Sequence, residues 1–542
     1  MQPSTLAKRA FLILFLAIGA FYLFGLGRLP LVGPDEPRYA QVAREMFLRA
    51  DLITPTLGGQ TWFEKPALLY WLMMVAYKLF GISEFSARLG PAICGLLTIP
   101  AVWLLGREME RASKGDQVPG IGRWSALSLA TSLGMIVFSR GASFDIVVTF
   151  TITWSLAFFA LYELAISRTN RKLLLAGFYA MIGLSLLAKG LIGLVIPFGV
   201  LGLYYLVCRR KPSREVLLSV LWGLPIVLIV ASTWYGPVIS RHGWSFINEF
   251  FVQHHLARYI SNKYQHPQPF YFYPAIVVLL TLPWTPFLVD SLLRLRSWNW
   301  SNLDLVSALR VFALCWMIFP LLFFSFSGSK LPGYILPVVP PVSILVGERI
   351  ARLCANKSCS KWPPVATGLI VIMLAIAAIS YSSQSGFPTL PMAVLLTLPL
   401  LISGLFTIVF SHHRCVAMTL TAVALLLMLA GVLQFVAASR AGRESVRDLL
   451  RLADAQGYGE AAVIIPRDRD RSAEFYASGR VVYDAHGEPA LVDELPQVIA
   501  ETRQRGKKIL VFVPVEYLEP YKQSPQWRII GDNGNLALVG TQ

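Results

Sequence analysis

The stretch "FLILFLAIGAFYLFGLG" (residues 11–27), followed at once by "RLPLVGPDEPRYAQVAREM" (28–46), decides the kind of fold that this chain adopts. The first part is apolar and uncharged, which is typical of a helix that crosses a membrane. The second part places two adjacent carboxylates, Asp35 and Glu36, and the guanidinium of Arg38 where that helix leaves the membrane. Charged groups at such a place are costly unless they are paired or functional.

The whole chain has the composition of a polytopic membrane protein. It has 542 residues, of which 55% are hydrophobic and 15% are charged, whereas soluble proteins carry about 25% charged residues. Because Lys8 and Arg9 precede the first apolar run and no small-residue cleavage site follows it, we expect a retained signal-anchor. We predict about thirteen spans of membrane length, near residues 10–27, 86–106, 124–140, 145–165, 173–188, 190–207, 217–238, 273–293, 305–325, 334–350, 364–382, 391–411 and 415–437.

The loops between these spans alternate in charge. One set is short and basic and includes "REMERASKGD", "SRTNRK", "CRRKPSR", "RLRSWNW", "ERIARLCANKSCSK" and "HHR". The positive-inside rule places this set in the cytoplasm. The opposite set holds residues 28–85, the turn before Asp145, residues 239–272 and "SGSKLPGY". The N-terminus is therefore predicted inside and the C-terminal segment outside. The net charge of +17 then reports orientation, and it also suits anionic lipids and a phosphorylated substrate.

Two domains are predicted. Residues 1–437 form the membrane domain with outer loops 28–85 and 239–272, and residues 438–542 form a small outer α/β domain. In the latter, "ESVRDLLRLADAQ" has helical periodicity, while "AAVII", "RVVYD" and "KILVFVPVEYL" are typical of strands and "WRIIGDNGNLALVG" of a hairpin. This domain has no nucleotide or metal motif, so a structural or lid role is expected. In the first outer loop, "PRYAQVAREMFLRA" and "TWFEKPALLYWLMMVAYKLFG" predict helices that lie in the membrane interface.

The cysteines predict no cross-links. They lie in spans or on the predicted cytoplasmic side, where disulfides are rare. Cys354 and Cys359 lack the second ligand pair that a zinc site needs. The six are Cys94, Cys208, Cys315, Cys354, Cys359 and Cys415.

Acidic and basic residues gather on the predicted outer face. Arginine and lysine there can hold a phosphate, and carboxylates can accept a proton or orient a hydroxyl. The set therefore suits an anionic head group whose tail lies in lipid. Its members are Asp35, Glu36, Arg38, Glu64, Lys65, Arg140, Asp145, Lys189, His254, His255, Arg258, His266, Lys330 and Tyr334.

Each member also has a purely structural interpretation. Asp35 fits an N-cap, and Glu36 and Arg38 fit a salt bridge at the start of a helix. Asp145 heads an apolar span, where a cap is equally expected. The lysines fit anchors whose charged ends reach the interface, and the histidines fit hydrogen-bonded interfacial residues. A functional site is favoured because all these residues lie on the same predicted side of the membrane.

Several motifs occur in one order over residues 10–350: "DEPRYAQVAREM", "GGQTWFEKPALLYW", "SRGASFD", "LAKGLIGLVIP", "FVQHHLARY", "HPQPFYFY", "LPWTP" and "SKLPGYILPVVP". In this combination the chain resembles the bacterial ArnT-like glycosyltransferases, the aminoarabinose transferase group related to protein O-mannosyltransferases. The resemblance implies a GT-C fold, an all-α polytopic membrane bundle with interfacial helices and a small C-terminal periplasmic α/β domain. It implies a polyprenyl-phosphate sugar donor, typically linked to undecaprenyl phosphate, and an acceptor such as lipid A outside the bacterial cytoplasmic (inner) membrane.

The resemblance also assigns roles to residues. Asp35 and Asp145 match the family's catalytic acidic positions, and Lys65 is placed to meet the donor phosphate. No cofactor is required, and a divalent metal is not implied, although histidines and aspartates share the outer face. The positions that match the substrate-binding residues are Glu36, whose role is the least clear, Arg38, Glu64, Lys65, Arg258, Lys330 and Tyr334.

The expected reaction is a single displacement with inversion. The lipid phosphate leaves the anomeric carbon, and positive charge near that phosphate stabilises the developing negative charge. If the acceptor is a hydroxyl, Asp35 is the expected general base. If the acceptor is a phosphate of lipid A, it is already ionised and the aspartate orients groups or stabilises an oxocarbenium-like sugar.

The sugar and the acceptor stay open. The second aspartate lies in "SFDIVV", without the proline expected shortly after it, which weakens the assignment of aminoarabinose. A protein O-mannosyltransferase-like or galacturonate transferase activity is the alternative within the enzyme class. A flippase or transporter for a lipid-linked sugar is an alternative of another class, but it predicts repeats or broken helices in both halves, and the sequence has no such symmetry.

Overall fold

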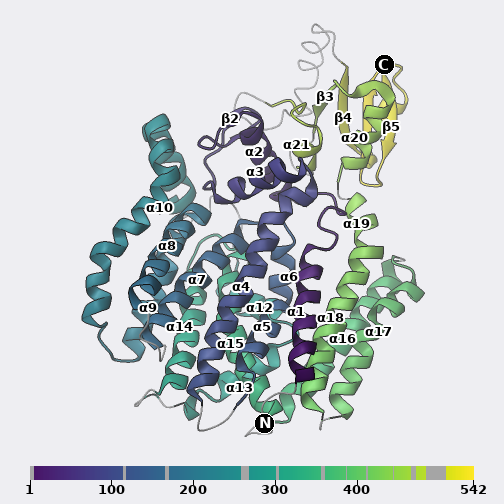
Figure 1. Ribbon diagram of the computed structural model, residues 1–542. Coiled ribbons are helices and arrows are strands. Elements are labelled where there is room, and N and C mark those ends of the chain that lie inside the picture. The colour runs from purple at the N-terminus through teal and green to yellow at the C-terminus, as the bar shows by residue number, and fades with distance from the viewer. Residues whose placement is uncertain are drawn as a thin grey trace. The chain divides into compact units, whose positions relative to one another are not determined.

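The structure is a computed structural model of the chain (Figure 1). It describes residues 5–113, 118–164, 170–257, 268–298, 300, 304–355, 360–385, 387–410, 413–443, 445–465, 471–483 and 508–542. The chain divides into two compact units. Unit 1 holds residues 1–24, 64–69 and 91–432, and unit 2 holds residues 25–63, 70–90 and 433–542. The predicted domain boundary at 437/438 stays a prediction. The two units divide the chain differently, because most of the first outer loop is grouped with the C-terminal segment.

Unit 1 is a bundle of helices. Its elements, of which α4 begins in unit 2, are α1 (Thr5–Leu23), α4 (Glu84–Ala112), α5 (Ile121–Ala130), α6 (Leu133–Ser139), α7 (Phe144–Leu164), α8 (Arg171–Lys189), α9 (Ile192–Val207), α10 (Arg214–Ile247), η1 (Asn248–Ala257), α12 (Phe272–Leu280), α13 (Thr285–Leu293), η2 (Leu295–Ser297), α14 (Leu305–Ser325), η3 (Pro332–Val338), α15 (Val339–Cys354), α16 (Trp362–Ser385), α17 (Leu390–Val409) and α18 (Arg414–Phe435).

The bundle confirms the predicted helical membrane fold. Among the described residues, nine helices are long and apolar enough to cross a membrane, and the pair α5–α6, bent by 55°, makes a tenth. All thirteen predicted spans lie on helices. Three of the predicted spans are not matched by one long apolar helix. The apolar part of α1 and the whole of α9 are shorter than a full span, and residues 273–293 are divided between α12 and α13.

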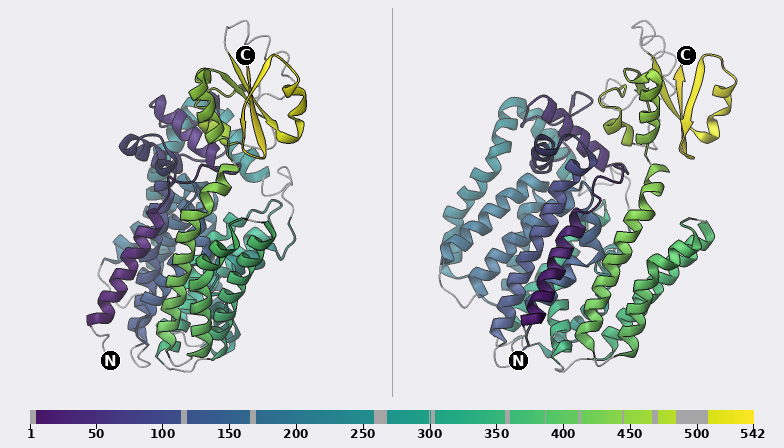
Figure 2. Two further views of the ribbon diagram at one scale, coloured as in Figure 1. Left: turned by 90° about the vertical axis from the view of Figure 1, so that its right-hand side faces the viewer. Right: turned by 45° about the vertical axis from the view of Figure 1, so that its right-hand side comes forward.

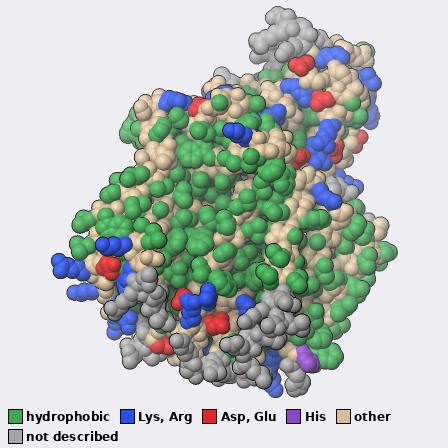
Figure 3. All heavy atoms as spheres, in the orientation of Figure 1, with side chains coloured by type: hydrophobic (Ala, Val, Ile, Leu, Met, Phe, Trp, Pro, Cys, Tyr) green, Lys and Arg blue, Asp and Glu red, His purple; other side chains and the backbone are tan. Residues whose placement is uncertain are grey.

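Charged side chains of the bundle lie mainly at its ends or in buried ion pairs. Hydrophobic side chains form a broad band over the bundle, and charged side chains gather at the end where the N-terminus lies (Figure 3). Two buried carboxylates of the bundle are paired with arginines: Glu348 accepts hydrogen bonds from Arg310 and Arg352, and Asp290 accepts one from Arg349 at 2.7 Å. Breaking such buried pairs is costly, so they fix α13, α14 and α15 against one another.

Unit 2 contains the sheet and the interfacial helices. Its elements are α2 (Glu36–Leu48), β1 (Thr56–Leu57), β2 (Gln60–Thr61), α3 (Leu68–Phe80), which begins in unit 1, α19 (Ala437–Arg443), α20 (Arg447–Ala453), η4 (Asp454–Tyr458), β3 (Ala462–Ile464), α21 (Ser472–Tyr476), β4 (Ile509–Pro514), η6 (Val515–Tyr517), α23 (Glu519–Lys522), β5 (Trp527–Asp532) and β6 (Leu536–Thr541).

The sheet has the order β3-β4-β6-β5, with β3 and β4 parallel and the other neighbours antiparallel. Alternate residues of β4 face opposite sides: Leu510 and Phe512 pack in the cluster that includes α20 and α21, and Val511 lies in the cluster on the other face. The β5–β6 hairpin turns at 533–535, as predicted. The small C-terminal α/β fold is therefore confirmed.

One prediction about the cysteines is wrong. Cys354, at the end of α15, and Cys415, at the start of α18, form a disulfide with their Cα atoms 5.3 Å apart. They are 61 residues apart in the sequence, and only the packing of the two helix ends brings them together. Loop charges could not reveal this contact.

Candidate functional site

The first group of predicted site residues lies at the start of α2. Asp35 is the N-cap residue, but its side chain makes no cap hydrogen bond. Its Oδ1 accepts a hydrogen bond from Nη2 of Arg38 at 2.7 Å, and its side chain is 51% exposed while that of Arg38 is 16% exposed. The Arg38 guanidinium lies over the ring of Trp62 at 5.5 Å. The exposed carboxylate can thus meet a ligand, and the N-cap interpretation lacks its hydrogen bond.

Glu36 has a different environment. Its two oxygens accept hydrogen bonds from Arg88, each at 2.7 Å, and Oε2 also accepts one from the N–H of Val32 at 3.2 Å. Arg88 donates further to three carbonyls in residues 26–30. A bidentate, charge-assisted pair of this kind fixes the loop before α2. The geometry favours an anchoring role for Glu36.

Three side chains form a second group in unit 1, where the start of α7, the end of α8 and η3 meet. Asp145, in the first turn of α7, forms an ion pair with Lys189, the last residue of α8. The Lys189 ammonium lies 4.5 Å from the centroid of the Tyr334 ring. The C-terminus of a helix and the face of an aromatic ring both favour a cation. We call Asp145, Lys189 and Tyr334 the α7–α8 cluster.

The segment that precedes Tyr334 approaches this cluster closely. A Cβ atom on Gly333 would collide with the carboxylate of Asp145, so the cluster requires glycine there. Lys330 is buried, and its Nζ donates to the carbonyls of Gln268 at 3.0 Å and Ser327 at 2.9 Å. Lys330 therefore holds the loop that leads to η3. This role differs from the two expected for it, which were to bind a phosphate or to reach the membrane interface.

The "FEKP" residues form a third group. Nζ of Lys65 donates to Oε1 of Glu64 at 2.5 Å, and both side chains are 12% exposed. Trp62 precedes this pair in the sequence, and within the described ranges its buried indole Nε1 has no hydrogen-bond acceptor. The indole N–H is thus a donor that a ligand oxygen can satisfy.

Part of the predicted site cannot be placed. The side chains of His254, His255, Arg258 and His266 lie outside the described residues. In the part of the chain that the structure describes, no three His, Cys, Asp or Glu side chains meet as metal ligands. The convergence of all the outer-face residues on one site stays a prediction.

Two arginines act as anchors that the sequence had not distinguished. Nη1 of Arg140 donates to the carbonyl of Phe21 at 2.6 Å and Nη2 donates to that of Phe24 at 2.5 Å, which satisfies the end of α1. Arg140 was among the candidates for function, whereas Arg88 was not singled out. An arginine early in an apolar span is costly without partners, and this signal was available for Arg88.

The C-terminal segment contacts the loop before α2 inside unit 2. The hydroxyl of Tyr476 accepts a hydrogen bond from the N–H of Leu31 at 2.7 Å and donates one to Oε1 of Glu84 at 3.1 Å. Nη1 of Arg447 donates to the same oxygen at 3.2 Å. Nη1 of Arg44, on α2, donates to the carbonyl of Phe475 at 3.1 Å. These bonds tie α20 and α21 to the segment that carries Asp35.

Comparison with known proteins agrees with this architecture. The family model described as dolichyl-phosphate-mannose-protein mannosyltransferase matches residues 64–235. The chain is 31% identical over 354 residues to the undecaprenyl phosphate-alpha-4-amino-4-deoxy-L-arabinose arabinosyl transferase 2 of Pseudomonas fluorescens, covering 64% of this chain and 57% of that protein. It is 30% identical over 381 residues to the corresponding transferase of Pseudomonas aeruginosa, covering 69% of this chain and 66% of that protein. The chain thus spans less than two thirds of the length of these relatives.

A solved structure shares the whole fold. The structure of ArnT from Cupriavidus metallidurans bound to undecaprenyl phosphate aligns with a TM-score of 0.77 at 22% identity, covering 98% of both chains. Its apo form aligns with a TM-score of 0.76 and the same coverage.

Proposed function

The chain is ArnT-like, and from this premise we propose that it is a membrane glycosyltransferase that moves a sugar from undecaprenyl phosphate to lipid A or another envelope acceptor. One observation carries the proposal: two lysines are paired with carboxylates and largely buried, Lys65 with Glu64 in the segment before α3, and Lys189 with Asp145 where α8 ends and α7 begins. A phosphate whose tail lies in lipid is a ligand that such groups fit. Both Pseudomonas relatives are named as undecaprenyl phosphate-aminoarabinose arabinosyl transferases, which supports the same donor.

The donor phosphate would be held by cations. Lys65 supplies a point charge, and Arg38, whose guanidinium lies over the ring of Trp62 at 5.5 Å, supplies a fork of N–H donors. As the bond between the anomeric carbon and the phosphate oxygen breaks, the electron pair leaves with undecaprenyl phosphate, and these cations stabilise it. The indole N–H of Trp62 is a further hydrogen-bond donor in the segment that carries Arg38.

The acceptor attacks the opposite face of the sugar, so the configuration inverts. If the acceptor is a hydroxyl, its proton passes to the carboxylate of Asp35, whose exposure leaves it open to a substrate. If the acceptor is a phosphate of lipid A, no proton moves and Asp35 orients the reacting groups. Asp145 and Lys189 would position the sugar, and Tyr334 would hold the lysine in place.

The proposed location is the bacterial inner membrane. Loop charge supports a cytoplasmic N-terminus and an outer C-terminal domain, because basic side chains mark the helix ends on the N-terminal side of the bundle. A protein acceptor is the second candidate, since the matching family model is described by transfer of mannose to protein.

The proposal is tested by donor turnover. The purified protein is mixed with undecaprenyl-phosphate sugars and an acceptor, and release of undecaprenyl phosphate is followed for wild type, Lys65→Ala and the control Lys361→Ala, which removes an exposed lysine at the opposite end of the bundle. We expect the KM for donor to rise at least about ten-fold in Lys65→Ala only, as loss of a charge-assisted contact implies. Equal KM values in all three proteins would contradict the phosphate site, and an intact donor in every mixture would contradict the reaction.

A further inference from the structure

A hydrophobic groove of about 1020 Å³ runs between α1 and α18, away from the groups described above. Both helices belong to unit 1 and lie side by side in Figures 1 and 2. We call this space the α1–α18 groove. Its apolar part is lined by Leu14, Ala17 and Phe21 of α1 and by Val423, Leu426 and Leu427 of α18, among others.

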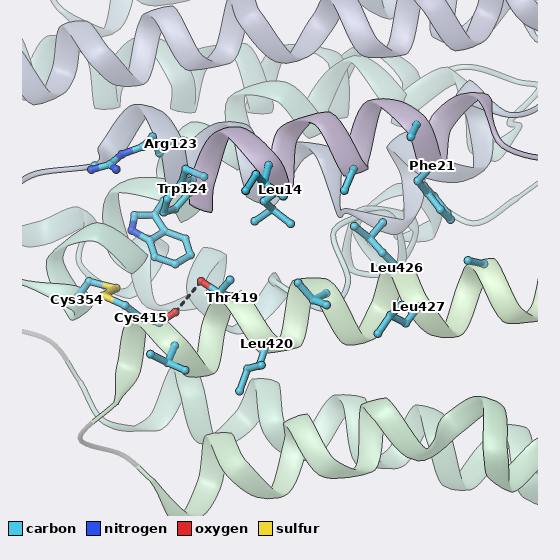
Figure 4. Close-up of a pocket in the computed structure, with 18 of the residues that line it drawn as sticks. Leu14, Phe21, Arg123, Trp124, Cys354, Cys415, Thr419, Leu420, Leu426 and Leu427 are labelled. Atoms are coloured by element: carbon cyan, nitrogen blue, oxygen red, sulfur yellow. Dashed lines mark hydrogen bonds between the residues drawn. A yellow bond between two sulfur atoms is a disulfide. The ribbon is translucent and has the colours of Figure 1, made fainter. Parts of the chain in front are cut away.

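One end of the groove is polar. Arg123 and Trp124 lie there with Thr419 and the Cys354–Cys415 disulfide, whereas the rest of the labelled lining is hydrophobic (Figure 4). The guanidinium of Arg123 lies over the ring of Phe11 at 4.9 Å, and within the described ranges it makes no ion pair. This end of the bundle also holds the N-terminus and the basic helix ends, so it lies at the level of the cytoplasmic head groups in the orientation proposed above.

The length and the charge of the groove favour a lipid as its occupant. The lining of α18 from Cys415 to Ala430 extends about 22 Å at 1.5 Å per residue. One leaflet holds about 15 Å of hydrocarbon, so the groove is long enough for the acyl chains of one lipid. Among the described residues that line the groove, Arg123 is the one charged side chain, and it lies at one end, as a head group that carries a phosphate requires.

We propose that the α1–α18 groove binds one anionic phospholipid of the cytoplasmic leaflet, with its phosphate at Arg123 and its acyl chains between α1 and α18. A guanidinium binds a phosphate through charge-assisted hydrogen bonds, and basic pockets between membrane helices on the cytoplasmic side are suited to anionic head groups. The chains fill apolar space that would otherwise lack contacts. This lipid is separate from the donor, because the polar end lies at the opposite end of the bundle from the α7–α8 cluster.

Native mass spectrometry of the purified full-length protein tests this inference without any transfer assay. The protein is titrated with phosphatidylglycerol, with zwitterionic phosphatidylethanolamine and with undecaprenyl phosphate. Arg123→Gln removes the charge, Arg123→Lys retains it, and Val423→Trp fills the groove. The matched controls are Lys172→Gln, an exposed lysine at the start of α8, and Leu228→Trp, on the exposed face of α10. Thermal unfolding verifies that each variant is folded.

We expect one phosphatidylglycerol per chain, bound at least about ten-fold more tightly than phosphatidylethanolamine. Arg123→Gln should abolish this preference and Arg123→Lys should keep most of it. Val423→Trp should weaken both lipids, and both controls should behave as wild type. The inference is overturned if Arg123→Gln and Lys172→Gln bind equally well, or if Val423→Trp binds as Leu228→Trp does. Tighter binding of undecaprenyl phosphate than of phosphatidylglycerol would instead assign the groove to the polyprenyl carrier.

Discussion

Tyr476→Phe should loosen the segment that carries Asp35 without unfolding the protein. The hydroxyl of Tyr476 accepts a hydrogen bond from the buried N–H of Leu31 at 2.7 Å and donates one to Glu84 at 3.1 Å. Burial raises the pKa of Tyr476 above its ordinary value, so the hydroxyl remains a donor at neutral and moderately alkaline pH. Phenylalanine keeps the ring and removes both bonds.

The size of the effect follows from the two partners. The N–H of Leu31 loses its acceptor, which costs about 1–3 kcal/mol for a buried donor. Glu84 loses one donor but keeps Arg447 at 3.2 Å, so this part lies near about 1 kcal/mol. Together they lower the free energy of local opening by about 2–4 kcal/mol, which corresponds to about 30- to 900-fold faster exchange of the affected amides.

Hydrogen–deuterium exchange of the peptide that covers residues 28–36 measures this directly. The matched control is Tyr458→Phe. It removes a hydrogen bond of 3.0 Å from the Tyr458 hydroxyl to the carbonyl of Thr541, which lies within the C-terminal fold and does not involve Leu31. We expect faster exchange of residues 28–36 in Tyr476→Phe only, at every pH from about 6 to 9 because the tyrosine stays protonated, together with slower transfer. Unchanged exchange in Tyr476→Phe, or an equal increase in Tyr458→Phe, would refute the reasoning.

Three further substitutions test other parts of the account. Gly333→Ala should displace the Asp145 carboxylate and lower kcat/KM about 100-fold, as a shift near 1 Å in a catalytic group does; wild-type kinetics would contradict the geometry. Lys189→Met should leave Asp145 without its ion pair and lower both transfer and the free energy of unfolding, the latter by about 1–3 kcal/mol, while Lys189→Arg keeps the charge; equal Tm and rate in the methionine variant would contradict the pair. Arg349→Met should destabilise by about 1–3 kcal/mol, with kcat unchanged, because buried Asp290 loses its partner at 2.7 Å and keeps Arg294 at 3.4 Å; an unaltered Tm by scanning fluorimetry would argue against that network.

Much of the architecture was accessible from sequence because membrane helices follow length and hydropathy. Every predicted span lies on one helix or on two consecutive helices, and the segments 36–48 and 68–80, predicted to lie in the interface, are helical as their sequence indicated. The hairpin at 533–535 followed from its turn residues. These features depend on local patterns, which a single sequence contains in full.

What the sequence could not supply are contacts between distant segments. The partner of Glu36 is Arg88, 52 residues away, and the hydroxyl of Tyr476 reaches Leu31 across 445 residues. Contacts between residues so far apart produce no periodic pattern in the sequence. The same limit explains the missed disulfide, and it explains why the carbonyl partners of Lys330 and Arg140 could not be foreseen.

The central claim is that an ArnT-like site built around Asp35 transfers a lipid-linked sugar. Asp35→Asn changes one exposed ion pair, which is worth at most about 1 kcal/mol, so the variant should fold normally. The direct measurement incubates wild type and Asp35→Asn with a panel of undecaprenyl-phosphate sugars and lipid A, and reads the product by mass spectrometry. The account predicts a mass gain on lipid A with wild type, of a size that identifies the sugar, and none with the folded variant. Equal mass gains from both proteins would contradict the assigned site, and no gain from wild type with any sugar would contradict lipid A as the acceptor.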